Sequence, residues 1–153
     1  MKAKYQAMLR KSLTDRANAF ESARSVQPPT NGWLQAVRTA LGMPLRVAGA
    51  RLHVSRVAIK SLEDRETTGA VTLKSMAKAA DALGCDFVYA VLPRAASFDA
   101  LLKQQAHSRA EAVVHSVGQS MALEQQATGK LEQRIQEVAA ELSANPRRLW
   151  SER

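Results

Sequence analysis

The chain has 153 residues, enough for one compact domain with extensions, and its 22 Lys and Arg against 14 Asp and Glu give a net charge of +8. The single cysteine, Cys85, excludes an internal disulfide, and no apolar run approaches the roughly 18 residues of a membrane span. A chain this small and basic favours a polyanionic partner, because each neutralised phosphate releases a counterion. Charged residues from Arg10 to Arg16 interrupt any secretory leader, so we expect a cytoplasmic protein.

The first segment, residues 1–27, is predicted to form a basic helix. Six basic residues against two acidic ones precede a loop over 26–32 that contains Pro28-Pro29 and Asn31-Gly32. These cations, with Arg38 further along, are candidates for phosphate contacts or a steering patch. The apolar residues of the helix instead indicate docking on the body of the protein or on a second subunit, and both interpretations stay open. They are Tyr5, Met8, Leu9, Leu13 and Phe20.

The middle segment, residues 28–93, carries signals for four short helices. Ser55 is a plausible N-cap, and Gly42 and Gly84 are plausible helix stops. After the last helix, residues 86–92 are β-branched or aromatic and end at Pro93, which favours a strand, although no partner strand is visible. The predicted helices cover residues 33–41, 44–52, 55–63 and 72–83.

The last segment, residues 94–153, is predicted to be a helical extension. Two apolar stripes with 4-3-4 spacing are separated by a stretch that contains Gly118 and Gly129, so two helices are favoured over one continuous rod. Asn145-Pro146 is expected to end the second helix. The predicted fold is therefore all-α: a helical domain with a short strand and helical N- and C-terminal extensions.

The stretch from Leu45 to Glu63 has the pattern of a helix-turn-helix. Such a motif needs a small residue where its helices touch, and Gly49 provides one; Val54, Ile59 and Leu62 supply apolar residues for the inside. The outward positions would face the major groove of DNA, which accepts an α-helix and exposes base edges to its side chains. On the same face Asp64 would repel phosphate and is expected to pair with an Arg. The candidate DNA contacts are Arg46, Ser55, Arg56, Val57, Lys60 and Ser61.

Periodicity alone also fits a plain helical hairpin, and the joint pattern decides between the two. A small residue, Val-Ser at the turn, a basic outer face and a closing Glu63 occur together, and in this the stretch resembles the phage-repressor-like helix-turn-helix family. The resemblance covers about residues 33–84. Two positions depart from it: Leu45 stands where the family usually has a phosphate-gripping Gln, and His53 stands where the turn usually has Gly.

A longer set of collinear blocks is similar to the family called mobile mystery protein A. The blocks are residues 32–43, the helix-turn-helix itself, residues 69–93 and an Ala-rich helical tail. Members resemble antitoxin-type regulators and are typically encoded beside a Fic-domain protein, mobile mystery protein B. The resemblance implies a repressor-like fold and a possible Fic-domain partner.

Catalytic, metal and cofactor sites are not expected. His53, His107, His115 and Cys85 are scattered, and the chain has neither a Gly-rich phosphate loop nor a nucleophile elbow. Cys85 is expected to be a small buried hydrophobic residue.

The sequence therefore predicts a non-enzymatic, sequence-specific regulator that binds double-stranded DNA, a repressor of antitoxin type. The alternative is an interaction module that holds and restrains a Fic-domain partner, with DNA binding secondary. A homodimer is expected, because repressors of this type read two half-sites. Residues 86–92 could pair with their own copy to form it, or they could instead continue as irregular chain.

Overall fold

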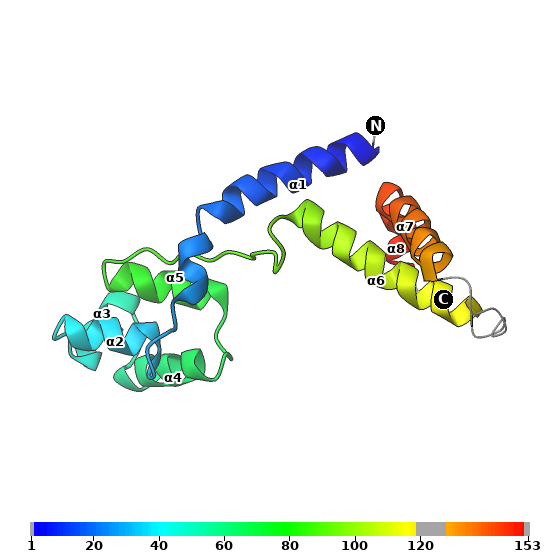
Figure 1. Cartoon of the computed structure of the whole chain (residues 1–153). Coiled ribbons are helices and arrows are strands. Elements are labelled where there is room, and N and C mark those ends of the chain that lie inside the picture. The colour runs from blue at the N-terminus through cyan, green and yellow to red at the C-terminus, as the bar shows by residue number, and fades with distance from the viewer. Residues whose placement is uncertain (1, 119–127, 152–153) are drawn as a thin grey trace. The chain divides into compact units, whose positions relative to one another are not determined.

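The computed structural model describes residues 2–118 and 128–151 (Figure 1). These residues form helices and connecting turns, and no β-strand occurs among them, which confirms the predicted all-α class. Their contacts separate into two units. Unit 1 consists of the described parts of residues 1–21 and 91–153, and unit 2 consists of residues 22–90. In neither unit is any described helix both long enough and apolar enough to cross a bilayer.

Unit 2 contains four short helices around one apolar core. Ser55 and Thr72 act as N-caps, because their side-chain oxygens accept hydrogen bonds from the backbone N–H groups of Ala58 and Ser75, each at 3.1 Å. Leu34, Met76, Ala79 and Leu83 form the buried centre of the core. The helices are α2 (Gly32–Ala40), α3 (Leu45–Leu52), α4 (Arg56–Thr67) and α5 (Leu73–Ala82).

The predicted helix boundaries of unit 2 are correct at most ends. Gly42 and Gly84 follow α2 and α5 with φ of +62° and +76°, a conformation that glycine adopts without strain. Pro44 was expected inside α3, but its extended backbone makes it the N-cap. α4 continues one turn beyond Glu63 and ends at Thr67.

The strand predicted over residues 86–92 is wrong. Residues 85–93 have no regular secondary structure, because a strand needs a neighbour and none lies beside this segment among the described residues. Phe87 packs against the core of unit 2, and its ring stacks on that of Tyr89 with centroids 6.1 Å apart. Val88 remains exposed. Cys85, expected to be buried, is exposed as well.

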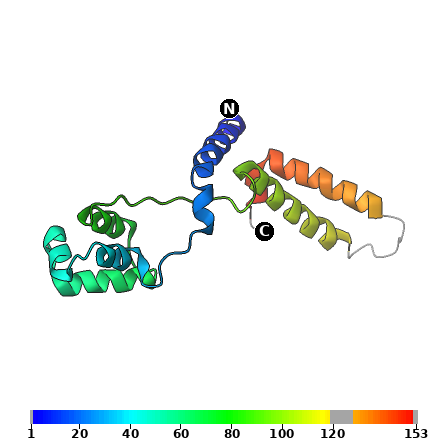
Figure 2. The same ribbon diagram turned by 60° about the vertical axis from the view of Figure 1, so that its left-hand side comes forward.

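Unit 1 is built on two helices that lie side by side, α6 (Phe98–Gly118) and α7 (Thr128–Ala144) (Figure 2). Two helices were predicted in this part of the chain. A short helix, α8 (Pro146–Leu149), was not predicted; it follows because Pro146 suits a first helical position. The buried core between these helices consists of Ala106, Ala110, Ile135, Leu142 and Leu149.

The N-terminal helix α1 (Lys2–Asn18) packs against α6 and belongs to the same unit. The Arg10 Nε donates to Asp99 Oδ1 at 2.7 Å, and the backbone N–H of Phe98 donates to Thr14 Oγ1 at 3.2 Å. Ala17 is buried. The basic first segment is thus held by the C-terminal segment. A short 3-10 helix, η1 (Glu21–Ser25), follows it.

Candidate nucleic-acid interface

Helix α4 presents one face to the core of unit 2 and the opposite face to solvent. Ile59 and Glu63 are buried, whereas Val57, on the other side, is 74% exposed. The outward side chains follow helical spacing in two neighbouring rows, Arg56 with Lys60 and Val57 with Ser61, each pair four residues apart. All six candidate DNA contacts are exposed: Arg46, Ser55, Arg56, Val57, Lys60 and Ser61.

A tight turn of three residues joins α3 to α4. His53 adopts the left-handed conformation with φ 55° and ψ 39°, and the Val54 N–H donates to the Gly49 carbonyl at 2.9 Å. His53 therefore takes the conformation that glycine usually supplies at such a turn. Val54, expected on the inside, is half exposed. Val54 contributes to the turn through its backbone N–H, which bonds to α3, and not through its side chain.

Gly49 is the point of closest approach between α3 and the turn. A Cβ atom at this position would lie 2.7 Å from the Val54 carbonyl oxygen, a separation shorter than van der Waals contact. Only glycine fits here without a shift of the backbone. The prediction of a small residue at the helix contact is therefore confirmed.

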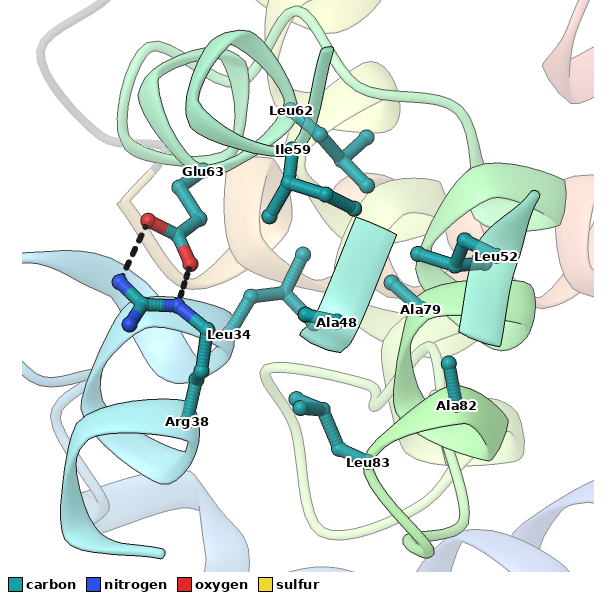
Figure 3. A pocket seen from close by; sticks show the side chains of 10 residues that line it. All are labelled: Leu34, Arg38, Ala48, Leu52, Ile59, Leu62, Glu63, Ala79, Ala82 and Leu83. Carbon is teal, nitrogen blue, oxygen red and sulfur yellow. Dashed lines mark hydrogen bonds and ion pairs between the residues drawn. The ribbon is translucent and has the colours of Figure 1, made fainter. Parts of the chain in front are cut away.

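A buried ion pair attaches α4 to α2. Glu63 is only 2% exposed, and its two carboxylate oxygens accept hydrogen bonds from Arg38 Nε at 2.6 Å and Nη2 at 3.1 Å, as Figure 3 shows. Arg38 Nη1 also donates to the Met43 carbonyl at 3.0 Å. The hydrogen bond to Glu63 raises the pKa of the Arg38 guanidinium. Arg38 was suggested as a phosphate contact. Its three guanidinium nitrogens instead donate hydrogen bonds within unit 2.

A second acidic residue of α4, Glu66, was missed by the sequence analysis. Its two oxygens accept hydrogen bonds from the backbone N–H groups of Trp33 at 2.7 Å and Leu34 at 2.9 Å, at the N-terminus of α2. A carboxylate there neutralises otherwise unpaired donors and complements the helix dipole. Gly32 makes this possible, since a Cβ on it would lie 2.8 Å from the Glu66 carboxylate. In the sequence, only the three-residue spacing of Glu63 and Glu66 indicates that both carboxylates lie on the same side of the helix.

The exposed face of α4 carries both signs of charge. Lys60 Nζ lies 2.5 Å from Asp64 Oδ1, one turn further along the helix, and both side chains are about half exposed. Asp64 was expected to pair with an Arg and pairs with this Lys instead. Arg56 is the first residue of α4, and Arg46 is the second residue of α3. The exposed face of α4 therefore offers one arginine and a lysine that is paired with a neighbouring carboxylate, and α3 adds a second exposed arginine.

The interior of unit 2 leaves no room for a ligand. A cavity of about 20 Å³ lies among Leu34, Ile59, Leu83 and their neighbours, whose apolar side chains point toward one another in Figure 3. This volume is close to that of a single water-sized probe. No group of His, Cys, Asp and Glu among the described residues has a metal-binding arrangement.

No protein family, curated protein or solved structure matches this chain.

Proposed function

We propose that α3, the turn and α4 form a helix-turn-helix and that the protein is a sequence-specific regulator that binds double-stranded DNA. The observation that carries the proposal is the outer face of α4, which is exposed and partly basic, while the inner face of the same helix is held against the core of unit 2. Side chains on such a face reach base edges when the helix lies in the major groove. The expected resemblance to phage-repressor-like proteins and to mobile mystery protein A points to the same function.

Rigid attachment of α4 supports this role. Glu63 and Glu66 connect the helix to α2 at two points one turn apart, so its outer side chains keep a fixed position relative to the domain. A preorganised reading surface loses less conformational entropy on binding than a mobile one. Helix α3 is joined to α5 by a hydrogen bond that Arg51 Nη1 donates to the Ala82 carbonyl at 3.0 Å.

Each candidate contact has a distinct task in this proposal. Arg56 and Lys60 are the base readers, because Arg and Lys donate to the acceptors that guanine presents in the major groove. Val57 can meet a thymine methyl group, and Ser61 can donate to or accept from either base type. Arg46 and Ser55 lie at the starts of α3 and α4, and their proposed task is contact with phosphates, since helix N-termini attract anions.

The experiment begins with selection of binding sites from a pool of random-sequence duplexes by the full chain at physiological salt. We expect one sequence to be enriched and to bind more tightly than its shuffled version in fluorescence anisotropy. The double variant Arg56→Ala/Lys60→Ala should lose about 1–3 kcal/mol for each good base contact. Its circular dichroism spectrum should remain that of the wild type, because both side chains are exposed.

The matched control is Lys103→Ala/Arg109→Ala, which removes the same charge from exposed positions of α6 in unit 1. It should weaken binding to the selected and shuffled duplexes to a similar, small extent. The proposal is overturned if no sequence is enriched, or if Arg56→Ala/Lys60→Ala binds the selected duplex as well as the control does.

A further inference from the structure

Helix α1 carries an apolar stripe that its own unit leaves uncovered. Tyr5, Leu9 and Leu13 follow one another at intervals of four residues, and Met8 lies beside them. Tyr5 is 65% exposed and Met8 is 64% exposed, although α1 is held on α6 by Arg10 and Thr14. The stripe therefore lies next to the contact between α1 and α6 and not within it.

The stripe continues into a groove of unit 1. A hollow of about 560 Å³ is bounded by Leu9 and Leu13 of α1, by Leu101 and Leu102 of α6, and by Trp150 beside α8. Trp150, at its edge, is 61% exposed. Its neighbour Leu149 is buried in the core of the unit, so the wall that carries the indole is anchored.

The groove carries little charge. Its polar lining includes the amides of Gln6 and Gln105, and the guanidinium of Arg10 is neutralised by Asp99 at 2.7 Å. The other basic residues of α1 flank the stripe and do not line the groove: Lys4 and Lys11 are the helical neighbours of Met8, and Lys2 and Arg16 each lie seven residues from Leu9. The apolar lining disfavours a strongly charged peptide as the occupant of the groove. It suits an uncharged, apolar protein surface.

We propose that this surface, the α1 stripe with the adjoining groove, is where two copies of the chain associate. The surface contains both a projecting part, Tyr5 and Met8, and a hollow, so a two-fold axis can place the stripe of each copy against the groove of the other. Because an aromatic side chain buries about 150–250 Å², the exposed parts of the stripe and Trp150 offer on the order of 500 Å². Two copies then bury about 1,000 Å², the size at which specific interfaces begin.

The exposed segment around Val88 is a weaker candidate for the same role. It has no regular hydrogen-bonded structure, so ordering it on association would cost conformational entropy. The walls of the groove are helices that are already ordered. The inference does not depend on DNA binding, and its test measures association alone.

The first test measures the mass of the full chain by sedimentation from about 1 to 100 μM, a range in which a specific interface of modest size associates. We expect twice the chain mass of 16.7 kDa at the upper end. Met8→Glu should raise the dissociation constant at least about tenfold, because the symmetric interface buries the new charge twice. Trp150→Ala is a second variant with the same expectation. Thermal unfolding identifies any variant that fails to fold.

Two controls separate this surface from others. Val117→Glu places the same charge at an exposed aliphatic residue of α6 outside the groove, and Val88→Glu places it on the irregular segment. Both should associate like the wild type. The proposal is overturned if the wild type remains a monomer throughout the range, or if either control dissociates while Met8→Glu and Trp150→Ala do not.

A spectroscopic readout locates the contact directly. The chain has two tryptophans, so Trp33→Phe leaves Trp150 as the only indole. Its emission should shift to shorter wavelength as the protein concentration rises, with the midpoint that sedimentation gives, because the exposed ring enters an apolar environment. An association that leaves this emission unchanged would place the interface elsewhere.

Discussion

Arg38 and Glu63, 25 residues apart in the sequence, form a two-point ion pair that joins α2 to α4. The Glu63 side chain is 2% exposed and that of Arg38 is 13% exposed, so neither charge is well hydrated. A pair of this kind orients helices more clearly than it stabilises them, because desolvation offsets much of the attraction. The consequence for the proposed function is a recognition helix with a defined rotation about its axis.

Removal of one partner of this pair should strongly destabilise unit 2. Glu63→Gln leaves the Arg38 charge poorly hydrated and without its carboxylate, which should cost about 3–5 kcal/mol in urea unfolding. The double variant Arg38→Met/Glu63→Met should be more stable than either single variant, because no unpaired charge remains. A loss below about 1 kcal/mol in Glu63→Gln would contradict the buried pair, since that is the range of surface ion pairs.

Two glycines should respond to alanine with opposite signs. Gly49→Ala brings a Cβ atom to 2.7 Å from the Val54 carbonyl oxygen and should destabilise the chain by about 1–3 kcal/mol. Gly129→Ala meets nothing within 4 Å in α7 and should stabilise by up to about 1 kcal/mol, because alanine is the better helix former. Thermal unfolding of the two variants beside the wild type tests both signs. Equal effects would show that α3 does not approach the turn so closely.

The turn should tolerate glycine and reject a β-branched residue at position 53. His53 has φ 55°, a conformation that costs a non-glycine residue roughly 1 kcal/mol. His53→Gly relieves this strain but adds flexibility to the unfolded chain, so the free energy of unfolding should change by less than about 1 kcal/mol. His53→Val should destabilise clearly, because two branches at Cβ crowd the left-handed backbone. If valine is tolerated as well as glycine, the backbone there is not left-handed.

Asp64 should limit DNA affinity through its hold on Lys60. Asp64→Asn removes an acceptor 2.5 Å from Lys60 Nζ and a negative charge from the outer face of α4. We expect the largest gain for the selected duplex, because Lys60 becomes free to donate to its base, and a smaller gain for shuffled duplexes from the loss of one negative charge near the phosphates. Asp81→Asn, an equal charge change at an exposed residue of α5, is the control. This expectation fails if the two variants gain equally.

Unit 1 should lose a small amount of stability in acid through Asp99. The hydrogen bond from Arg10 lowers the pKa of Asp99, so its contribution is present above the ordinary pKa of an aspartate and is lost as the pH falls through the lowered value. The carboxylate is half exposed, so the contribution should stay below about 1 kcal/mol. Melting temperatures between pH 6 and pH 3 should fall less in Asp99→Asn than in the wild type. Asp15→Asn, at an exposed residue of α1, should fall like the wild type.

Helix limits in unit 2 could be predicted because they depend on neighbours in sequence. A hydroxyl at Ser55 reaches an N–H three residues later, and glycine at positions 42 and 84 takes up a positive φ wherever a helix must stop. The outward placement of Arg56 and Lys60 follows from the same local rule, since helical spacing alone separates them from the buried Ile59.

The strand prediction failed because it rested on side-chain composition alone, which does not supply a hydrogen-bonding partner. Phe87, Tyr89 and Val91 have side chains typical of sheets, but a sheet also requires a second segment to complete the hydrogen bonds. The described part of the chain offers none beside them. The segment is irregular for that reason.

Only the tertiary structure decided how the helices use their charges. Arg38 looked like a phosphate ligand until the fold placed it on Glu63, and Arg10 looked free until Asp99, 89 residues away, lay against it. Nothing local distinguishes such cations from those that remain exposed. Their partners are fixed by the packing of helices distant in sequence, and the burial that makes a charge seek a partner exists only after that packing has formed.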